Sequence, residues 1–377
     1  MERCDVLIVG GGPAGSSCAR QLTRAGCDVA ILDKAAFPRD KVCTGWITPA
    51  VVRALDLDLS DYGASRTLQP FTGFQTGGMD GDLLLTDFHR TISYGIRRCE
   101  FDDYLLRRSG ARLCLGRPLL TLRREGDAWV ANDAIRAAVV IGAGRHFCPV
   151  ASRLEAGTGH EDVIVAQEAE YQLDDRNACR IREDQPALFF WPDLRGYGWC
   201  VRKGAYVNVG AGHLSRAGLA SRVRTFAAML RQRGMLTGPE VHPWKGHAYL
   251  LAPLSSRPLY DTGVLLAGDA AGLALAPSGE GILAAVESGL IAAETILAST
   301  QDYSRARLAV YADRIDARFG RRGRRQYASL VPDWLTAVAS RVLLKSPRLT
   351  RRLIIEDGFL HLRRAPISVP ECRAASA

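Results

Sequence analysis

The sequence contains no long hydrophobic run, no paired-cysteine motif and no recognisable leader. Its 377 residues include 10 cysteines, but none forms Cys-x-x-Cys, and no cysteine–histidine cluster has the spacing of a zinc site. No window reaches the ~18 consecutive apolar residues that a transmembrane helix needs, and no cleavable signal precedes the first apolar segment. We therefore expect no metal and no membrane span, and reduced thiols in a cytoplasmic protein are the simplest interpretation.

The sequence also shows no internal repeat and no low-complexity segment, and its charges are not concentrated in blocks before the last quarter. Lys and Arg number 49 against 40 Asp and Glu, a formal net charge of +9. This balance favours an anionic ligand, a pyrophosphate or an acidic membrane surface. Because the cations are dispersed until the last quarter, we expect no nucleic-acid partner. Hydrophobic residues make up 47% of the chain, which is enough for a large core, and the length favours two domains or one large domain with insertions.

The first 33 residues carry the strongest pattern in the sequence. Val6–Val9 is a run of β-formers typical of a strand buried on both faces, and G-x-G-x-x-G and a helical stretch follow it. A second apolar strand ends at Asp33, about 20 residues on, where an acid is needed to bind a ribose hydroxyl. These features predict a dinucleotide with its pyrophosphate at the helix N-terminus, whereas the alternative is a strand–turn–helix with incidental glycines. The predicted cofactor residues here are Gly10, Gly12, Pro13, Ala14, Gly15, Asp33 and Lys34.

Buried-type strands recur at 137–141 and 263–267, and each runs directly into a glycine-rich turn. Between them, apolar segments over 163–210 are typical of consecutive antiparallel strands, and 216–233 is an amphipathic helix. The glycine-rich stretch 62–81 is expected to be irregular. A discontinuous nucleotide domain follows from this pattern. We predict that it comprises 1–72, 95–160 and 255–300, with a substrate domain over 73–94 and 161–254 and a helical C-terminal region over 301–377.

Four separated motifs in roughly the first 300 residues resemble those of the FAD-dependent geranylgeranyl reductase family. That family lies within the larger group of para-hydroxybenzoate hydroxylase-like monooxygenases and flavin halogenases. The first motif is the glycine fingerprint with its terminal acid. The second, Phe37–Gly45, is similar to F-P-R-x-K-x-C-G-G, with Thr44 in place of the first glycine of the pair. The third is Arg98-x-x-Phe101-Asp102, and the fourth joins Leu265–Gly272 to Pro277–Ile282, similar to G-D-A-A-G…P-x-x-G-E-G-I.

The resemblance implies an α/β fold of the glutathione reductase/PHBH type with α+β insertions. A Rossmann-like, discontinuous FAD-binding domain would be joined to an antiparallel β substrate domain and a helical C-terminal region. It implies FAD as cofactor, with Asp33 on the adenosine ribose, Arg98 in contact with FAD and Asp269 on the ribityl chain. The backbone over Gly279–Ile282 would lie beside the flavin pyrimidine edge. The further cofactor residues predicted from these motifs are Arg39, Lys41, Cys43, Gly268, Gly279, Gly281 and Ile282.

Two residues are candidates for a catalytic role. The resemblance implies that Cys43 lies near the isoalloxazine ring, where the neighbouring Lys41 and Arg39 favour a thiolate; the alternative is a small residue packing under the ring. The loop Gly142–Arg145 lacks the aspartate that relatives carry there, which bears on coupling to pyridine nucleotide. His146 follows this loop and is a candidate proton donor, although a hydrogen-bonded structural histidine is the commoner case.

Aromatic residues are expected to form a substrate pocket over the flavin. The segment Gly196–Gly204 resembles the family's Y-G-W-x-F-P-K-G, whose strands form the wall of that pocket, and Tyr197 and Trp199 alternate to one face. The alternative is an aromatic face packed on the sheet core. The predicted pocket residues are Trp46, Tyr197, Trp199 and Pro277.

The preferred function is reduction of C=C bonds in an isoprenoid or in another lipophilic or secondary-metabolite substrate, by hydride transfer from reduced flavin. The alternatives are a monooxygenase or halogenase acting through a flavin C4a-hydroperoxide, and a non-catalytic flavin-binding or electron-carrier protein. No second G-x-G-x-x-G is present, so NAD(P)H docks transiently or another electron donor or carrier protein reduces the flavin. The basic, apolar segment 340–364 is either a solvated helix face or a peripheral membrane contact.

Overall fold

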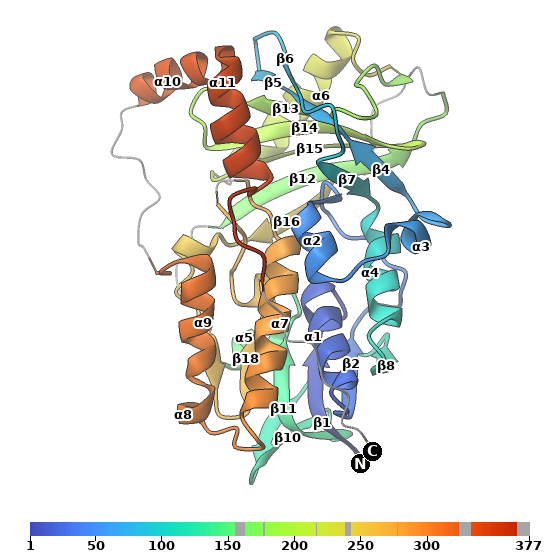
Figure 1. The fold of residues 1–377 in the computed structure, drawn as a ribbon, viewed down its shortest axis with the longest axis vertical. Coiled ribbons are helices and arrows are strands. Elements are labelled where there is room, and N and C mark those ends of the chain that lie inside the picture. The colour runs from blue at the N-terminus through green and yellow to red at the C-terminus, as the bar shows by residue number, and fades with distance from the viewer. Residues whose placement is uncertain are drawn as a thin grey trace.

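The computed structural model describes residues 1–154, 163–175, 178–215, 217–237, 243–276, 278–323 and 333–367. Two large β-sheets lie one above the other along the long axis of the molecule (Figure 1). Helices cover the lower sheet, which contains the N-terminal strand, and the C-terminal helices stand beside the upper sheet. This arrangement confirms the predicted α/β fold with antiparallel insertions.

The first sheet has the N-terminal strand at its centre. Its order is β17-β18-β11-β1-β2-β8, and β10 and β9 continue from β11. β1 (Glu2–Val9) pairs in parallel with β2 (Val29–Asp33) and with β11 (Ile135–Gly142), which in turn pairs in parallel with β18 (Val264–Leu266). The carboxyl ends of these strands therefore meet at one edge, where open α/β sheets bind their ligands. The outer strands are β8 (Arg112–Leu115), β9 (Leu122–Glu125), β10 (Ala128–Ala131) and β17 (Tyr260–Asp261).

Helices pack closely over the first sheet. α1 (Pro13–Arg24) leaves the end of β1 and packs against α7 (Ile282–Ala298), whose residues are buried almost throughout. This burial explains why α7 is apolar on nearly every side. The other helices around this sheet are α2 (Pro49–Ala54), α3 (Leu59–Gly63), α4 (Arg98–Arg107), α5 (Pro149–Arg153), α8 (Arg305–Leu308) and α9 (Val310–Phe319), with short 3₁₀ turns η2 (Ala252–Leu254) and η3 (Gly268–Ala270).

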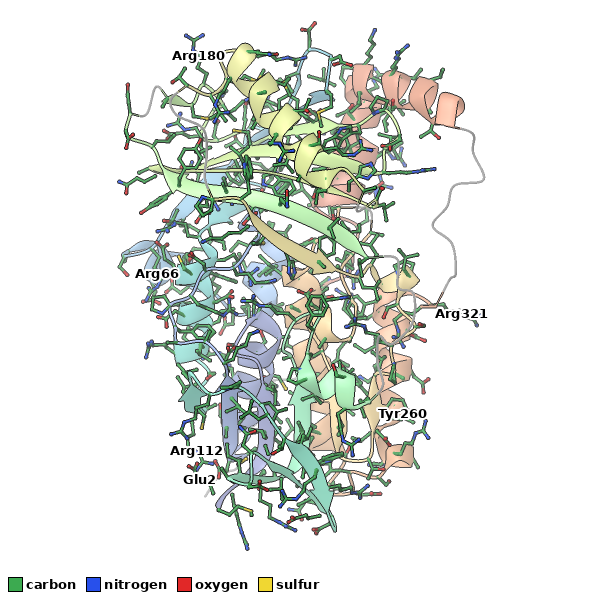
Figure 2. All side chains as sticks on the ribbon, turned by 180° about the vertical axis from the view of Figure 1, so that it is seen from behind. Glu2, Arg66, Arg112, Arg180, Tyr260 and Arg321 are labelled. Carbon is green, nitrogen blue, oxygen red and sulfur yellow. The ribbon has the colours of Figure 1, made fainter. Side chains whose placement is uncertain are left out.

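The second sheet has the order β16-β12-β15-β14-β13-β5-β6 and is antiparallel except where β13 pairs with β5. α6 (Leu219–Gln232) covers its far face, as the view from behind shows (Figure 2). There Phe226 packs with Phe189 in a core of its own. The strands are β5 (Gly73–Gly78), β6 (Leu84–Asp87), β12 (Ile164–Gln172), β13 (Ala187–Phe190), β14 (Gly196–Lys203), β15 (Tyr206–His213) and β16 (Lys245–Tyr249).

A small third sheet and the C-terminal helices complete the fold. β7 (Ser93–Ile96) pairs with β3 (Trp46–Ile47) and β4 (Leu68–Phe71). α10 (Asp333–Lys345), α11 (Pro347–Leu349) and the π-helix η4 (Thr350–Phe359) follow one another beside the second sheet (Figure 1). Ile354, Ile355 and Phe359 are buried there against aromatic residues of the sheet.

One local prediction was wrong, and one helix that is present has a different first residue. Residues 62–81 are not irregular, because β4 and the whole of β5 lie within them and pair with strands later in the sequence. The helix predicted over 216–233 begins at Leu219, since Gly218 has a left-handed φ of +73° and stands at its N-terminal cap; residue 216 lies outside the described residues. The boundaries of the predicted domains stay a prediction.

Candidate active site

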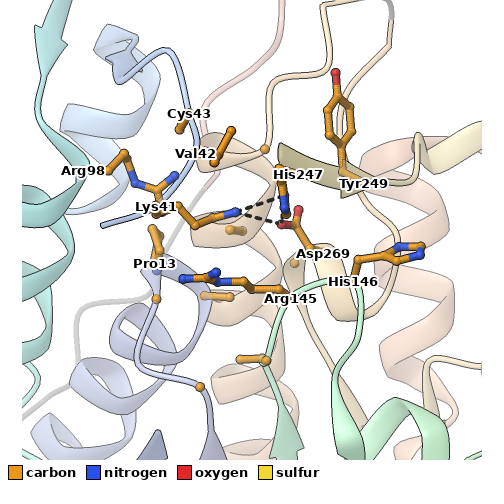
Figure 3. A pocket seen from close by; sticks show the side chains of 18 of the residues that line it. Pro13, Lys41, Val42, Cys43, Arg98, Arg145, His146, His247, Tyr249 and Asp269 are labelled. Atoms are coloured by element: carbon orange, nitrogen blue, oxygen red, sulfur yellow. Dashed lines mark hydrogen bonds and ion pairs between the residues drawn. The ribbon is translucent and has the colours of Figure 1, made fainter. Parts of the chain in front are cut away.

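A cavity of about 580 Å³ lies between the two large sheets, at the carboxyl ends of β1, β2 and β11. Figure 3 shows its interior from close by. Most of the cofactor residues predicted from sequence line this cavity. They are Gly10, Gly12, Pro13, Ala14, Asp33, Lys34, Arg39, Lys41, Cys43, Arg98, Gly268, Asp269, Gly279, Gly281 and Ile282.

The glycine turn is shaped by close backbone contacts. Gly10 has a φ of +117°, and a Cβ atom there would lie 2.4 Å from the Ala143 carbonyl oxygen. A Cβ at Gly15 would lie 2.0 Å from the Gly10 carbonyl oxygen, so Gly15 closes the turn from beneath and is not part of the cavity lining. Asp33 is fixed at the end of β2, because its carboxylate accepts hydrogen bonds from the Gly11 N–H at 2.8 Å and the Ala35 N–H at 2.9 Å. The acid is therefore held beside the bare backbone of the turn.

Basic side chains surround the space in front of this turn. Arg98 donates two hydrogen bonds of 2.9 Å to the fully buried Asp102, and Arg39 lies 3.1 Å from the same carboxylate. Burial opposes ionisation of Asp102, yet the two guanidinium groups hold its pKa below the usual range. Two cations thus share one anion, and Arg145 points into the same space (Figure 3). This excess of positive charge beside exposed amide groups fits the pyrophosphate of FAD.

Arg145 was not predicted as a functional residue. It occupies a left-handed conformation, with a φ of +70°, immediately after the turn that ends β11. This is the loop in which the family aspartate is replaced. The position of the loop at a strand end was visible in the sequence, but the direction of the Arg145 side chain was not.

Lys41, His247 and Asp269 form a second polar group in the cavity (Figure 3). Lys41 Nζ lies 3.1 Å from His247 Nε2 and 3.5 Å from Asp269 Oδ2, and the His247 and Asp269 atoms are 3.3 Å apart. Burial opposes ionisation of Asp269, but Lys41 and His247 hold its pKa far below the usual range. Burial and the Lys41 ammonium also lower the pKa of His247, so this imidazole is neutral at neutral pH. His247 was missed by the sequence analysis, since only the pairing of β16 with β12 brings it here.

His146 lines the cavity, but its contacts are typical of a structural histidine. Arg257 donates to its carbonyl oxygen at 2.9 Å and lies 3.2 Å from its Nδ1. Figure 3 shows the His146 ring turned away from Lys41 and Asp269. Its proposed role as a proton donor stays a prediction.

The loop that carries Cys43 is fastened to the second sheet. The Cys43 N–H donates to Glu168 Oε1 at 2.5 Å, and its carbonyl accepts from Asn208 Nδ2 at 3.3 Å. The fully buried Lys203 donates to the Thr44 carbonyl at 3.0 Å and is ion-paired with Glu170. Because the backbone of Thr44 makes this contact, the replacement of glycine by threonine leaves it intact.

The aromatic wall includes two of the four residues predicted for it. Tyr197 and Trp199 line the cavity from β14, and their polar atoms are satisfied by the Ser278 carbonyl at 2.6 Å and Asn208 Oδ1 at 2.7 Å. Trp46 lies outside the lining of this cavity, where its ring stacks on Phe74 and Phe359 at centroid distances of 4.7 and 5.6 Å, and its role in a substrate pocket stays a prediction. Pro277 lies outside the described residues.

The described part of the chain shows neither a metal-binding cluster nor a helix long and apolar enough to cross a membrane. The cysteines that it includes are all free thiols.

The chain is similar in sequence and in structure to known FAD-dependent oxidoreductases. The profile of the FAD dependent oxidoreductase family (DAO) matches residues 5–79. A geranylgeranyl diphosphate reductase of Rhodobacter capsulatus is 31% identical over 317 residues, covering 78% of this chain and 75% of the relative. A menaquinone reductase of Mycobacterium tuberculosis is 28% identical over 342 residues, covering 83% and 81%. The crystal structure of a geranylgeranyl bacteriochlorophyll reductase-like protein from Thermoplasma acidophilum has a TM-score of 0.72 at 22% identity and covers 92% of this chain and 89% of that one.

Fold, fingerprint and cationic cavity together define an FAD-dependent oxidoreductase. Within that class, the chain is 31% identical to the Rhodobacter reductase over more than two thirds of both proteins. The chain belongs to the geranylgeranyl reductase family.

Proposed function

We propose that this protein reduces carbon–carbon double bonds of a lipophilic isoprenoid substrate. The observation that carries the proposal is the continuity of one cavity, from the cationic glycine turn to the aromatic wall of Tyr197 and Trp199. A flavin held at the first end would present its ring to an apolar chain lying on the second. The names of the relatives, which include a geranylgeranyl diphosphate reductase, support an isoprenoid as the substrate class.

Each part of the cavity has a separate task in this proposal. The Gly12 backbone with Arg39 and Arg145 binds the pyrophosphate, Asp33 binds the ribose and Asp269 binds the ribityl chain. When bound, FAD supplies the hydride. The tightly held Cys43 loop limits movement beside the ring, and the aromatic wall excludes water and orients the substrate.

Anaerobic reduction followed by controlled reoxidation tests this function. We expect protein loaded with FAD and reduced by dithionite to be reoxidised by geranylgeranyl diphosphate, with a hydrogenated product detected by mass spectrometry. Admission of air alone should give slow reoxidation. A long-lived C4a-hydroperoxide absorbance without alkene reduction would instead establish a monooxygenase or halogenase. Replacing dithionite by NADH or NADPH shows whether a nicotinamide or a separate donor protein is the reductant.

We also propose that the C-terminal helices contact an anionic membrane surface. Apolar side chains on α10 and η4 are exposed, with Val338 at 50%, Val342 at 58% and Leu353 at 50% of their full accessibility. Exposed cations accompany them, including Arg341 and Arg352. A mixed apolar and basic surface is complementary to acidic headgroups above acyl chains. Such contact would bring the cavity close to lipids that carry isoprenoid chains.

The double variant Val342→Asp, Leu353→Asp should bind vesicles of phosphatidylglycerol and phosphatidylcholine about tenfold more weakly or worse than wild type, because it removes apolar area and adds repelled charge. Sedimentation with vesicles measures this loss. Leu120→Asp is the matched control, since Leu120 is 78% exposed but lies beside the first sheet. Equal binding by the double variant and the wild type would identify these helices as a solvated face.

A further inference from the structure

Glu168 occupies a central place on the cavity face of the second sheet. Trp199 of β14 is opposite Gly210 of β15, and Gly210 is opposite Glu168 of β12. A Cβ atom at Gly210 would lie 2.4 Å from Trp199 Cζ2 and 2.7 Å from Glu168 Cβ. The glycine therefore lets the indole ring and the carboxyl side chain lie next to each other on the same face. The acid is thus part of the surface on which the substrate would rest.

The carboxyl group of Glu168 is buried and only half engaged. The residue is 4% exposed; Oε1 accepts from the Cys43 N–H, whereas Oε2 has no hydrogen-bond partner among the described residues. Burial raises the pKa of Glu168 to about 7, and nearby Glu170 adds to this effect. The Cys43 N–H, Lys203 and Asn208 oppose it. Both protonation states are therefore populated near neutral pH. Glu170, by contrast, is held as an anion by Lys203 and Arg97, which lower its pKa despite burial.

Glu168 also lines a second, smaller cavity of about 90 Å³. That volume accommodates a few water molecules at ~30 Å³ each. Its wall includes Asp40 and Lys245, whose ion pair of 2.6 Å is largely exposed to solvent. Lys41, Val42, Arg98 and Glu168 line both cavities. Of these four, Glu168 is the one carboxyl group, and its pKa of about 7 lets it release a proton and regain it near neutral pH.

We propose that Glu168 is the proton donor for alkene reduction, and that water in the second cavity then reprotonates it. This inference rests on the proposed function. As one alkene carbon accepts the hydride of reduced flavin, the π electron pair forms a C–H bond with the Glu168 proton at the other carbon. The Glu168 O–H bond breaks and leaves a carboxylate. Water in the second cavity returns a proton to it, so that the sum is one hydride and one proton added across the double bond.

A purely structural role for Glu168 would lie in holding the Cys43 loop, and two substitutions separate the roles. Glu168→Gln keeps a side-chain oxygen that can accept from the Cys43 N–H but cannot act as a carboxylic acid. Glu168→Asp keeps the acid on a shorter side chain. Glu183→Gln is the matched control, because Glu183 is paired with Arg202 and lies outside both cavities.

Single-turnover mixing of reduced enzyme with geranylgeranyl diphosphate, without oxygen, measures the proton-dependent step. Glu168→Gln should slow flavin reoxidation about 10²-fold or more, which is the range of general acid catalysis, and Glu168→Asp should recover part of the rate. The wild-type rate should fall as pH rises through about 7, where the acid loses its proton, and this dependence should disappear in Glu168→Gln. The affinity for FAD, measured by fluorescence titration, should be equal in the wild type and in Glu168→Gln. Infrared spectra should show a carboxylic acid band that titrates near neutral pH in wild type and is missing from Glu168→Gln.

A wild-type rate of flavin reoxidation in Glu168→Gln would overturn the proton-donor role. Loss of FAD binding in that variant would also overturn it, because Glu168 would then serve to hold the Cys43 loop in place. A carboxylic acid band that titrates near neutral pH and is unchanged by the substitution would overturn this role as well. If wild-type enzyme itself does not reduce the alkene, the proposed function fails and this role fails with it. If Glu168→Gln still reduces the alkene at the wild-type rate, the proton-donor role of Glu168 fails but the proposed function stands.

Discussion

Asp102→Ala should lower the free energy of unfolding by about 3–5 kcal/mol, because it leaves buried guanidinium groups without their carboxylate. Arg98 is 6% exposed and donates hydrogen bonds to both carboxylate oxygens of Asp102, and Arg39 Nη1 lies 3.1 Å from Oδ2 of the same carboxylate. Urea unfolding followed by circular dichroism gives the change, provided that the slope of the transition is unchanged.

The neighbouring Asp103 provides the control for this experiment. Asp103 pairs with Arg107 at 3.2 Å on the same helix, but Arg107 is 60% exposed. Asp103→Ala should therefore change stability by less than about 1 kcal/mol. Equal losses in the two variants would show that the buried cluster is not responsible, since alanine has a higher helix propensity than aspartate and would by itself stabilise the helix.

The same cluster gives stability a defined dependence on pH. The pKa of Asp102 is lower in the folded protein than in the unfolded chain, so its contribution is complete above the unfolded value. It is lost as the pH falls toward the lower folded value. Asp102→Ala should accordingly flatten the acid side of the stability curve.

The first nucleotide segment could be predicted because several local signals agree. The apolar run of β1, the glycine turn and the position of Asp33 all specify one strand–turn–helix unit, and tertiary contacts do not alter it. The strand β5 illustrates the opposite case. Its glycine-rich sequence has weak strand propensity, and pairing with β13, more than a hundred residues later, makes it part of a sheet.

His247 and Glu168 could not be predicted as site residues from the sequence, for the same physical reason. His247 and Glu168 enter the cavity because of the register between β12, β15 and β16, and a shift of one residue would turn both to the other face. Strand register is set by pairings that a local sequence pattern does not contain. Motifs could therefore locate the cofactor end of the cavity, whereas its polar substrate face required the structure.

Gly12→Ala should weaken FAD binding about a hundredfold while leaving the protein folded. Gly12 has a φ of −77°, which alanine adopts readily, and an added Cβ would meet Arg39 Nη2 at an ordinary 3.6 Å. The methyl group would nevertheless occupy the space in which a pyrophosphate approaches the bare backbone, and a hundredfold loss corresponds to about 2.7 kcal/mol. Unfolding free energy without FAD should change by less than about 0.5 kcal/mol.

Gly15→Ala should behave differently, because its Cβ would lie 2.0 Å from the Gly10 carbonyl oxygen and backbone cannot move aside as a side chain can. We expect this variant to lose stability as well as FAD, by about 1–3 kcal/mol from overpacking alone. Equilibrium dialysis with FAD and thermal unfolding without it distinguish the two variants. FAD affinity of Gly12→Ala equal to that of wild type would place the pyrophosphate elsewhere in the cavity. The contrast between the variants is informative because the two glycines belong to one motif, yet Gly12 lines the cavity, whereas Gly15 lies against the Gly10 backbone outside the lining.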